Sequence, residues 1–518
     1  MTRVSRTAAL SVAAALLAAC AVGRPAPGAG GPAPRVGVPP RAAAGGPAAT
    51  PAVAGPDLPP IRAGAAWRAI TPEVKPGGPP VRMAGFGPGR DATGVHDDLD
   101  ARALVIEAGA QSVALVVLDL IGFFHDEVEK IRREAREREP GLSAAYIMVA
   151  STHTHAGPDV IGLWTPPGRP IDPGYVAQVR DRAAEALAEA WRVRQPARLS
   201  IAAARLGRFI HDSRLPIVID DAAFLVQAET ADGRATIASL AVFADHPESL
   251  GRGNTLLSSD YPGATRRALE ETFGGVAIFA SADLGGLMTP LDADVVDPAT
   301  KRPVPAGTFE RSEILGQEVA RALIAAWGAR ADAPGGGPPV VARAALEARA
   351  REFRVPLVNS RFQRGLAEGM IWPRALAPDG TLTSEAGVVT LRVAAAPAGA
   401  PPRGTAPTGT VETVAQIACV PGEIYPELVV GGIQDPQDPG ADLQGARREP
   451  ALRSLMSGRH RIVIGLCNDE LGYIIPMSQW DEQAPFAYGR DSPQYGEMNS
   501  AGPRTAPLLL DLFADLLR

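Results

Sequence analysis

The chain has 518 residues, of which 46% are hydrophobic, so it is long enough to bury one large core or two ordinary ones. Its formal net charge is −6, and acidic and basic residues are interspersed without a basic run. This charge pattern argues against nucleic acid as the main partner.

Residues 1–20 have the pattern of a lipoprotein signal peptide. Two arginines precede an apolar run from Ala8 to Ala19, which is too short to span a bilayer comfortably. The run ends in LAAC, which resembles a bacterial lipoprotein box, so Cys20 is expected to become the lipidated first residue of the mature chain. The alternative is an ordinary signal peptide that contains a cysteine. We expect an exported protein that is lipid-anchored to the bacterial cell envelope and does not span a membrane.

Residues 21–62 consist almost entirely of Ala, Gly, Pro and Val and lack a periodic apolar face. This composition predicts a flexible tether before a folded part over 63–518. Position 21, directly after the lipidated cysteine, is alanine and not the aspartate that is associated with inner-membrane retention. In a Gram-negative host this favours anchoring to the outer membrane, on its periplasmic side or at the surface. Cys419 and Cys467 could pair in an oxidising periplasm or stay as buried thiols.

In the folded part, short Val/Ile-rich runs alternate with runs of helical periodicity. Several strand-like runs are almost continuously apolar, which suits strands that are covered on both faces. The pattern predicts one layered α/β domain with mixed β-sheets and flanking helices. The expected strands are 103–108, 113–120, 145–151, 223–229, 238–244, 276–281, 388–395 and 461–466; the expected helices are 125–139, 176–194, 262–273, 310–329 and the chain end. The Gly/Pro-rich stretches 331–340 and 395–410 are expected to be loops.

Several common catalytic motifs are absent from the sequence. It contains no G-x-S-x-G, no H-E-x-x-H, no C-x-x-C and no phosphate-binding lysine loop. The stretch GFGPGR (85–90) lacks the spacing of a dinucleotide-binding turn and is interpreted as a plain turn.

Two histidines follow the strand-like run AYIMVA within the stretch ASTHTHAGPD (150–159). In an extended chain, residues i and i+2 face the same side, so His153 and His155 could share one cavity at the end of a strand. His246 likewise follows the run ASLAVFA. A single H-x-H is weak evidence, and the second histidine at a strand end raises the functional interpretation. Asp260, before Pro262, is interpreted as a helix cap.

Six segments, taken together, resemble the neutral/alkaline ceramidase family. Their order and spacing agree over residues 65–518, although each segment alone is a modest signal. They are GVHDDLDARALVI (94–106), ASTHTHAGPD, VFADHPESL with LLSSDYPGA, VPGEIYPELV (420–429), GLCNDELGYIIP (465–476) and QYGE (494–497).

The resemblance implies a hydrolase that cleaves an amide with one zinc ion. It implies that the zinc ligands are His153, His246, Glu423 and Tyr473. Two imidazoles, a carboxylate and a phenol leave a position for water, as a catalytic zinc site requires. Without a metal, Tyr473 would be a strand tyrosine and Glu423 an exposed loop carboxylate.

The same resemblance assigns roles next to the metal. His155 would hold the substrate, stabilise the developing oxyanion or shuttle a proton to the leaving amine. Tyr495 matches a substrate-contacting tyrosine, and Arg214 is the candidate for the family's arginine. The remaining histidines (His96, His125, His211 and His460) are expected to be structural or at the surface.

The sequence departs from the family in two places. Where the family has a serine near the zinc, this chain has Met288, or Thr289 if one residue is inserted, and Asp283 could supply a polar group there instead. The family's C-terminal immunoglobulin-like domain has no counterpart in these residues. The expected activity is hydrolysis of ceramide or a related lipid amide. The alternatives are a zinc hydrolase for another amide or ester, and a catalytically lapsed lipoprotein that binds in the envelope.

Overall fold

The structure is a computed structural model, and it describes residues 58–518 except 167, 170, 333–339, 395–410 and 434–438. The expected signal peptide, Cys20, both Gly/Pro-rich loops in most of their length and the tether up to residue 57 lie outside the described residues. The first strand begins at Ile61, two residues before the expected start of the folded part. No helix in the described part is long and apolar enough to cross a membrane.

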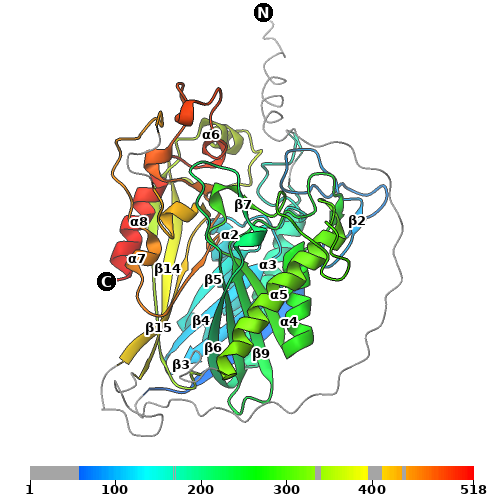
Figure 1. Cartoon of the computed structure of the whole chain (residues 1–518), viewed down its shortest axis with the longest axis vertical. Coiled ribbons are helices and arrows are strands. Elements are labelled where there is room, and N and C mark those ends of the chain that lie inside the picture. Colours follow the sequence, from blue (N-terminus) through cyan, green and yellow to red (C-terminus); the bar gives the residue numbers. More distant parts are fainter. Residues whose placement is uncertain (1–57, 167, 170, 333–339, 395–410, 434–438) are drawn as a thin grey trace, which may run out of the picture. The chain divides into compact units, whose positions relative to one another are not determined.

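Two sheets form the centre of the fold (Figure 1). The larger sheet has eight strands in the order β11-β9-β8-β6-β1-β3-β4-β5, with parallel pairs only at its two edges. Its strands are β1 (Ile61–Ala69), β3 (Asp100–Ala108), β4 (Gln111–Leu118), β5 (Ala145–Ser151), β6 (Gln195–Arg205), β8 (Ala222–Thr230), β9 (Thr236–Phe243) and β11 (Val276–Ser281). The predicted layered α/β fold with mixed sheets is confirmed.

The second sheet has four strands and lies against the first through a shared apolar core. Its order is β13 (Ala345–Pro356), β14 (Thr381–Ala394), β15 (Val411–Cys419) and β17 (His460–Ile464), of which only the last pair is parallel. Alternate residues of β14 face opposite sides, as a strand requires. Val389 and Leu391 enter the shared core, whereas Val388 packs in the cluster that holds the C-terminal helix.

Helices cover the outer faces of both sheets (Figure 1). The pair α2 (His125–Arg138) and α3 (Pro173–Arg192) packs on the side of β1, β3 and β4. The pair α4 (Tyr261–Phe273) and α5 (Phe309–Asp332) packs on β6, β8 and β11, and α8 (Thr505–Leu516) covers β13 and β14. Helices α6 (Ser360–Ala367) and α7 (Leu452–Leu455) are short, as are the strand pairs β2 (Gly94–Val95) with β10 (Leu256–Leu257), β7 (His211–Asp212) with β12 (Met288–Thr289), and β16 (Glu423–Ile424) with β18 (Tyr473–Ile474).

The two edge strands of the large sheet meet at their carboxyl ends. The Ser281 hydroxyl, at the end of β11, donates to the Thr152 carbonyl just past β5 at 2.7 Å. The segment after β17 joins both edges, because Gly465 N donates to the Ser281 carbonyl at 2.9 Å and Ser151 N donates to the Leu466 carbonyl at 3.2 Å. This junction brings strand ends from both sheets to one place.

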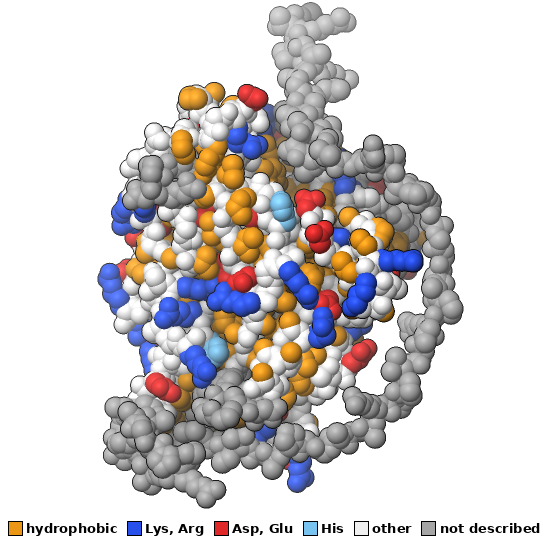
Figure 2. All heavy atoms as spheres, in the orientation of Figure 1, with side chains coloured by type: hydrophobic (Ala, Val, Ile, Leu, Met, Phe, Trp, Pro, Cys, Tyr) orange, Lys and Arg blue, Asp and Glu red, His pale blue; other side chains and the backbone are white. Residues whose placement is uncertain are grey.

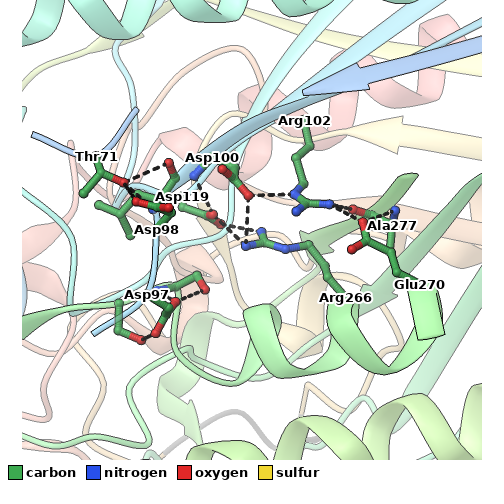
Figure 3. A network of polar contacts seen from close by, with 12 residues as sticks. Thr71, Asp97, Asp98, Asp100, Arg102, Asp119, Arg266, Glu270 and Ala277 are labelled. Atoms are coloured by element: carbon green, nitrogen blue, oxygen red, sulfur yellow. Dashed lines mark hydrogen bonds and ion pairs between the residues drawn. The ribbon is translucent and has the colours of Figure 1, made fainter. Parts of the chain in front are cut away.

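A buried charge network fixes α4 against the large sheet (Figure 3). Arg266 of α4 forms a bidentate pair with Asp119, at 2.7 and 2.8 Å, and Arg102 of β3 bonds both Asp100, at 2.9 Å, and Glu270 of α4, at 2.5 Å. Planar guanidinium–carboxylate pairs define orientation as well as attraction. The network therefore sets the direction in which the N-terminus of α4 points.

Candidate metal centre

The candidate centre lies at the junction of the strand ends. His153 comes two residues after β5, and His246 comes three residues after β9. Both side chains are at least 95% buried. A backbone hydrogen bond of 3.0 Å from His155 N to the Pro247 carbonyl ties the two histidine-bearing segments together. The prediction that both strand ends contribute to one site is confirmed.

The chain is not extended at His153, where φ is +66°. The two imidazoles of H-T-H nevertheless meet, with ring centroids 5.0 Å apart. The expected meeting is right, but strand alternation is the wrong reason: a left-handed turn at His153 produces it. Such a conformation is uncommon outside glycine and costs free energy that the surrounding contacts must offset.

The rings of His153 and His246 are oriented by backbone carbonyls. Their Nδ1 atoms lie 2.5 Å from the Ile121 carbonyl and 2.7 Å from the Met288 carbonyl, respectively. A carbonyl accepts only from a protonated nitrogen, so each Nδ1 carries the hydrogen and each Nε2 presents a lone pair. This arrangement is typical of metal-ligating histidines.

Glu423 completes a set of ligand atoms. Its Oε2 lies 3.3 Å from His153 Nε2 and 3.2 Å from His246 Nε2. Ligand atoms of a tetrahedral zinc site, each roughly 2.0–2.2 Å from the ion, are themselves about 3.3–3.5 Å apart. Burial raises the pKa of Glu423, but protons on the Nε2 atoms of His153 and His246, where a metal would otherwise bind, outweigh burial and lower this pKa to about 2. A carboxylate held ionised among imidazoles is a ready metal ligand.

His155 joins the other two histidines in one cluster whose nitrogens can hold a metal ion, with all three atoms within 4.8 Å of one another. Its ring centroid lies 5.7 Å from that of His246, and neither ring nitrogen makes a hydrogen bond among the described residues. Burial, and then the neighbouring imidazoles, lower the pKa of His155 well below its usual value. A neutral imidazole in this position can accept or donate a proton.

Tyr473 lies beside Glu423, because the short parallel strands β16 and β18 place the two residues opposite each other. The tyrosine is 5% exposed. Burial and the charge of Glu423 raise its pKa well above the usual value. Its ring packs edge-on against Tyr425 and Tyr495, each with centroids 5.8 Å apart. The alternative of an exposed Glu423 is wrong, because this residue is 7% exposed, whereas Tyr473 does lie in a strand.

Arg214 and Tyr495 belong to the group of side chains around Tyr473 and Tyr425. The guanidinium of Arg214 bonds Glu497 through two contacts of 2.7 and 2.9 Å and donates to the Tyr495 carbonyl at 2.7 Å and to the Gln479 carbonyl at 3.0 Å. These bonds involve both terminal nitrogens, and Arg214 is 2% exposed. Its visible role is to hold the tyrosine-bearing segment in place.

Met288 and Thr289 make different contacts. The Met288 carbonyl holds His246, whereas the Thr289 hydroxyl accepts from Leu291 N at 3.2 Å. Asp283 faces another group of charges: after burial, the neighbouring Asp220 is the main cause that raises its pKa, and Arg453 opposes this. The participation of Thr289 in catalysis therefore stays a prediction, and Asp283 interacts with Asp220 and Arg453.

The loop 84–90 lies directly over His155, which the interpretation as a plain turn did not anticipate. Gly85 has φ +82°, and a Cβ added there would lie 2.6 Å from the His155 ring. The Phe86 ring meets His155 edge-on at 5.0 Å, and Arg90 donates to the His155 carbonyl. The closely spaced glycines were the sequence feature that could have indicated this contact, because a backbone can approach a ring this closely only at a residue without a side chain.

Glu248 is the second residue that the sequence did not single out. Its Oε2 lies 3.3 Å from His155 Nδ1, and it is 9% exposed. It follows His246 by two residues, so the position of a carboxylate in HPE just past a strand end was the available signal. Asp260 is confirmed as a helix cap, accepting from Tyr261 N at 2.6 Å at the start of α4.

Cys419 and Cys467 form a disulfide, which resolves the two alternatives left by the sequence. Cys419 precedes Glu423 by four residues, and Cys467 precedes Tyr473 by six. The bridge therefore links the two segments that carry the carboxylate and the phenol. Of the remaining histidines, His125 is structural, with Nδ1 3.1 Å from the Asn468 carbonyl.

The α/β fold that carries this buried histidine cluster is similar to the fold of solved ceramidase structures. The chain has the fold of the neutral ceramidase from Pseudomonas aeruginosa, with a TM-score of 0.62 over 89% of this chain and 74% of that one, at 17% identity. A structure of a ceramidase complexed with C2 is similarly close, with a TM-score of 0.61 over 89% of this chain and 75% of that one, also at 17% identity. No family model matches the sequence, and no curated protein does.

Proposed function

We propose that this protein is a zinc-dependent hydrolase that cleaves the N-acyl amide of ceramide or of a related lipid amide. The observation that carries the proposal is the spacing around Glu423, whose Oε2 lies 3.2 and 3.3 Å from two oriented Nε2 atoms within a ceramidase-like fold. The proposed ligands are His153, His246, Glu423 and Tyr473.

Zinc in this position would lower the pKa of a bound water and polarise the amide carbonyl. His155 is neutral and buried beside the ligands, so it can take a proton from the attacking water and return it to the leaving amine. The balanced reaction consumes one amide and one water and yields a carboxylic acid and an amine.

A second candidate is a zinc hydrolase for a different amide or ester. Met288 favours it, because a buried thioether stands where the resemblance places a serine, and a thioether donates no hydrogen bond. If Thr289 replaces that serine, its hydroxyl can donate to the substrate while it accepts from Leu291 N. The two candidates share the metal ligands and differ in the substrate pocket.

The proposed location is the cell envelope, with the chain anchored through lipid on Cys20. The lipoprotein-like LAAC sequence supports this location, and so does the disulfide, because disulfides persist in oxidising compartments. Labelling with a palmitate analogue tests the anchor: wild type should carry the label and Cys20→Ala should lose it. A labelled Cys20→Ala protein would contradict lipidation at this residue.

Metal analysis and a fluorescent-ceramide assay test the proposed function together. Wild type should contain one zinc per chain and hydrolyse the amide, whereas His153→Ala should lose both properties. His96→Ala is the matched control, because this histidine is 41% exposed and pairs with Asp97 outside the cluster. Zinc-free protein after purification without chelators would refute the enzyme, and zinc without any acyl-amide hydrolysis would favour the envelope-binding alternative.

A further inference from the structure

A cavity of about 540 Å³ opens where the large sheet meets the start of β17. One wall is apolar and comes from β6, β8 and α5, with Ile201, Ala202, Phe224 and Ala326 among its side chains. The opposite wall is basic and comes from the segment 453–461. On the face drawn in Figure 2, apolar side chains likewise adjoin basic ones over β6 and the neighbouring end of α5. Its volume is in the range of small-molecule sites.

Two of the four arginines in this cavity are neutralised by carboxylates. Arg453 bonds Asp220 at 2.8 and 2.6 Å, and Arg205 pairs with Asp221. These paired arginines still line the cavity, but their charges are balanced and are not available to a ligand. The binding capacity of the cavity must therefore come from its other basic side chains.

Arg459 and Arg461 supply unbalanced positive charge. Neither has a carboxylate within 4.0 Å in the part of the chain that the structure describes. Arg461 is held by the backbone, since its Nε donates to the Gly458 carbonyl at 3.3 Å and its Nη1 to the Arg453 carbonyl at 3.0 Å. Its Nη2 is left to bind a ligand. A guanidinium already fixed in this way loses little side-chain entropy when it binds an anion.

His460 lies between these arginines and is 7% exposed, yet its Nε2 makes no hydrogen bond among the described residues. The Phe224 ring stands edge-on to it at 6.5 Å. Leaving a buried polar nitrogen without a partner costs free energy unless a ligand or water satisfies it. The orphan nitrogen therefore points to an occupant that can hydrogen-bond.

We propose that this cavity is a binding site for an oxyanion attached to a short apolar group, such as a carboxylate or phosphate on an alkyl chain. The oxyanion pairs with Arg459 and Arg461 and accepts a hydrogen bond from His460 Nε2. The alkyl group lies against Phe224 and the alanines of β6. The site shares no residue with the histidine cluster, and it stands whether or not the proposed hydrolase activity is correct.

Titration calorimetry with octanoate, octyl phosphate, inorganic phosphate and octanol tests the site, with the imidazole NMR signals of His460 as the local reporter. Octanoate or octyl phosphate should bind and shift the His460 signals, and the better of the two identifies the oxyanion. Arg459→Ala combined with Arg461→Ala should weaken binding by roughly tenfold or more for each lost charge-assisted bond. Arg349→Ala combined with Arg351→Ala, on the exposed face of β13, should leave binding unchanged.

Three results would overturn the proposal. Octanol that binds as tightly as octanoate would show that charge is not recognised. Inorganic phosphate that binds as tightly as octyl phosphate would show that the apolar wall contributes nothing. An unshifted His460 signal in ligand-saturated protein would place the binding elsewhere. Because both arginines are exposed, their replacement tests binding without a risk to the fold.

Discussion

Removal of the Cys419–Cys467 disulfide should destabilise the protein strongly and damage the metal centre. The bridge closes a loop with a sequence separation of 48 residues. Loop-closure entropy for this length corresponds to roughly 4 kcal/mol at 25 °C, which is about a thousandfold in the unfolding equilibrium. The ends of β15 and β17 also lie next to the segments with Glu423 and Tyr473, so a looser junction should weaken zinc binding.

The assay is urea unfolding of wild type and of the double variant Cys419→Ala with Cys467→Ala, each with and without a reductant. Wild type under reducing conditions and the double variant should both lose roughly 3–5 kcal/mol, and the reductant should leave the double variant unchanged. Competition with a zinc chelator reports the metal affinity of each form. If the double variant unfolds within about 1 kcal/mol of wild type, the parallel pairing of β15 and β17 alone holds the junction, and the stabilising role of the bridge is refuted.

Four other changes test individual contacts. Gly85→Ala should lower turnover more than tenfold with zinc content unchanged, because the added Cβ would meet the His155 ring. Gly89→Ala controls for backbone strain, because Gly89 has φ +91° and no atom within 4 Å of an added Cβ, and it should lower turnover far less. Arg214→Ala should cost about 3–5 kcal/mol of stability by leaving the buried Glu497 carboxylate without the positive charge that it pairs with, and an effect below 1 kcal/mol would contradict the buried pair. Glu423→Gln should weaken zinc binding at least tenfold, whereas unchanged affinity would remove this carboxylate from the ligand set. Burial and then the charge of Arg459 lower the pKa of His460 to about 4 in the folded protein, so the unfolded state takes up a proton at higher pH than the folded state does. As the pH falls from 6.5 to 4, the free energy of unfolding of wild type should therefore decrease, relative to that of His460→Gln, by up to about 1.4 kcal/mol per pH unit. Parallel pH profiles of the two proteins would contradict this.

The elements that could be predicted from the sequence are those whose burial pattern is uniform. β5 and β11 are predicted to the residue, because continuous Val/Ile-rich runs suit strands covered on both faces. β6 and β13 were missed, because QPARLSIAAAR is rich in alanine and ALEARAREFRVP in charges, and neither composition is typical of strands. Their place in the sheets is decided by pairing partners that lie far away in the sequence.

Site residues could be predicted where their residue type is rare in the sequence, and were missed where they contribute through the way a loop packs. Because the chain has only seven histidines, the pair His153 and His155 and the single His246 at strand ends are conspicuous, and resemblance added Glu423 and Tyr473. Gly85 matters because it has no side chain, and Glu248 is one of many acidic residues, so neither residue is conspicuous in the sequence. Their contacts with His155 depend on how the loops fold over the strand ends, which local periodicity does not contain.

Backbone strain favours the catalytic alternative over a lapsed binding protein. Eight non-glycine residues in the described part have positive φ, and six of them lie in segments that carry or adjoin the centre: Phe86, His153, Asp260, Leu287, Leu466 and Asn468. Each such conformation costs roughly 1–2 kcal/mol, against a net stability of about 5–15 kcal/mol for a typical domain. Structural packing does not by itself require so much strain in one place, whereas the positioning of reactive groups does. The turn at His153 illustrates this point, because it brings the imidazoles of His153 and His155 into a single cluster with His246. Strand alternation alone would not have given them this orientation.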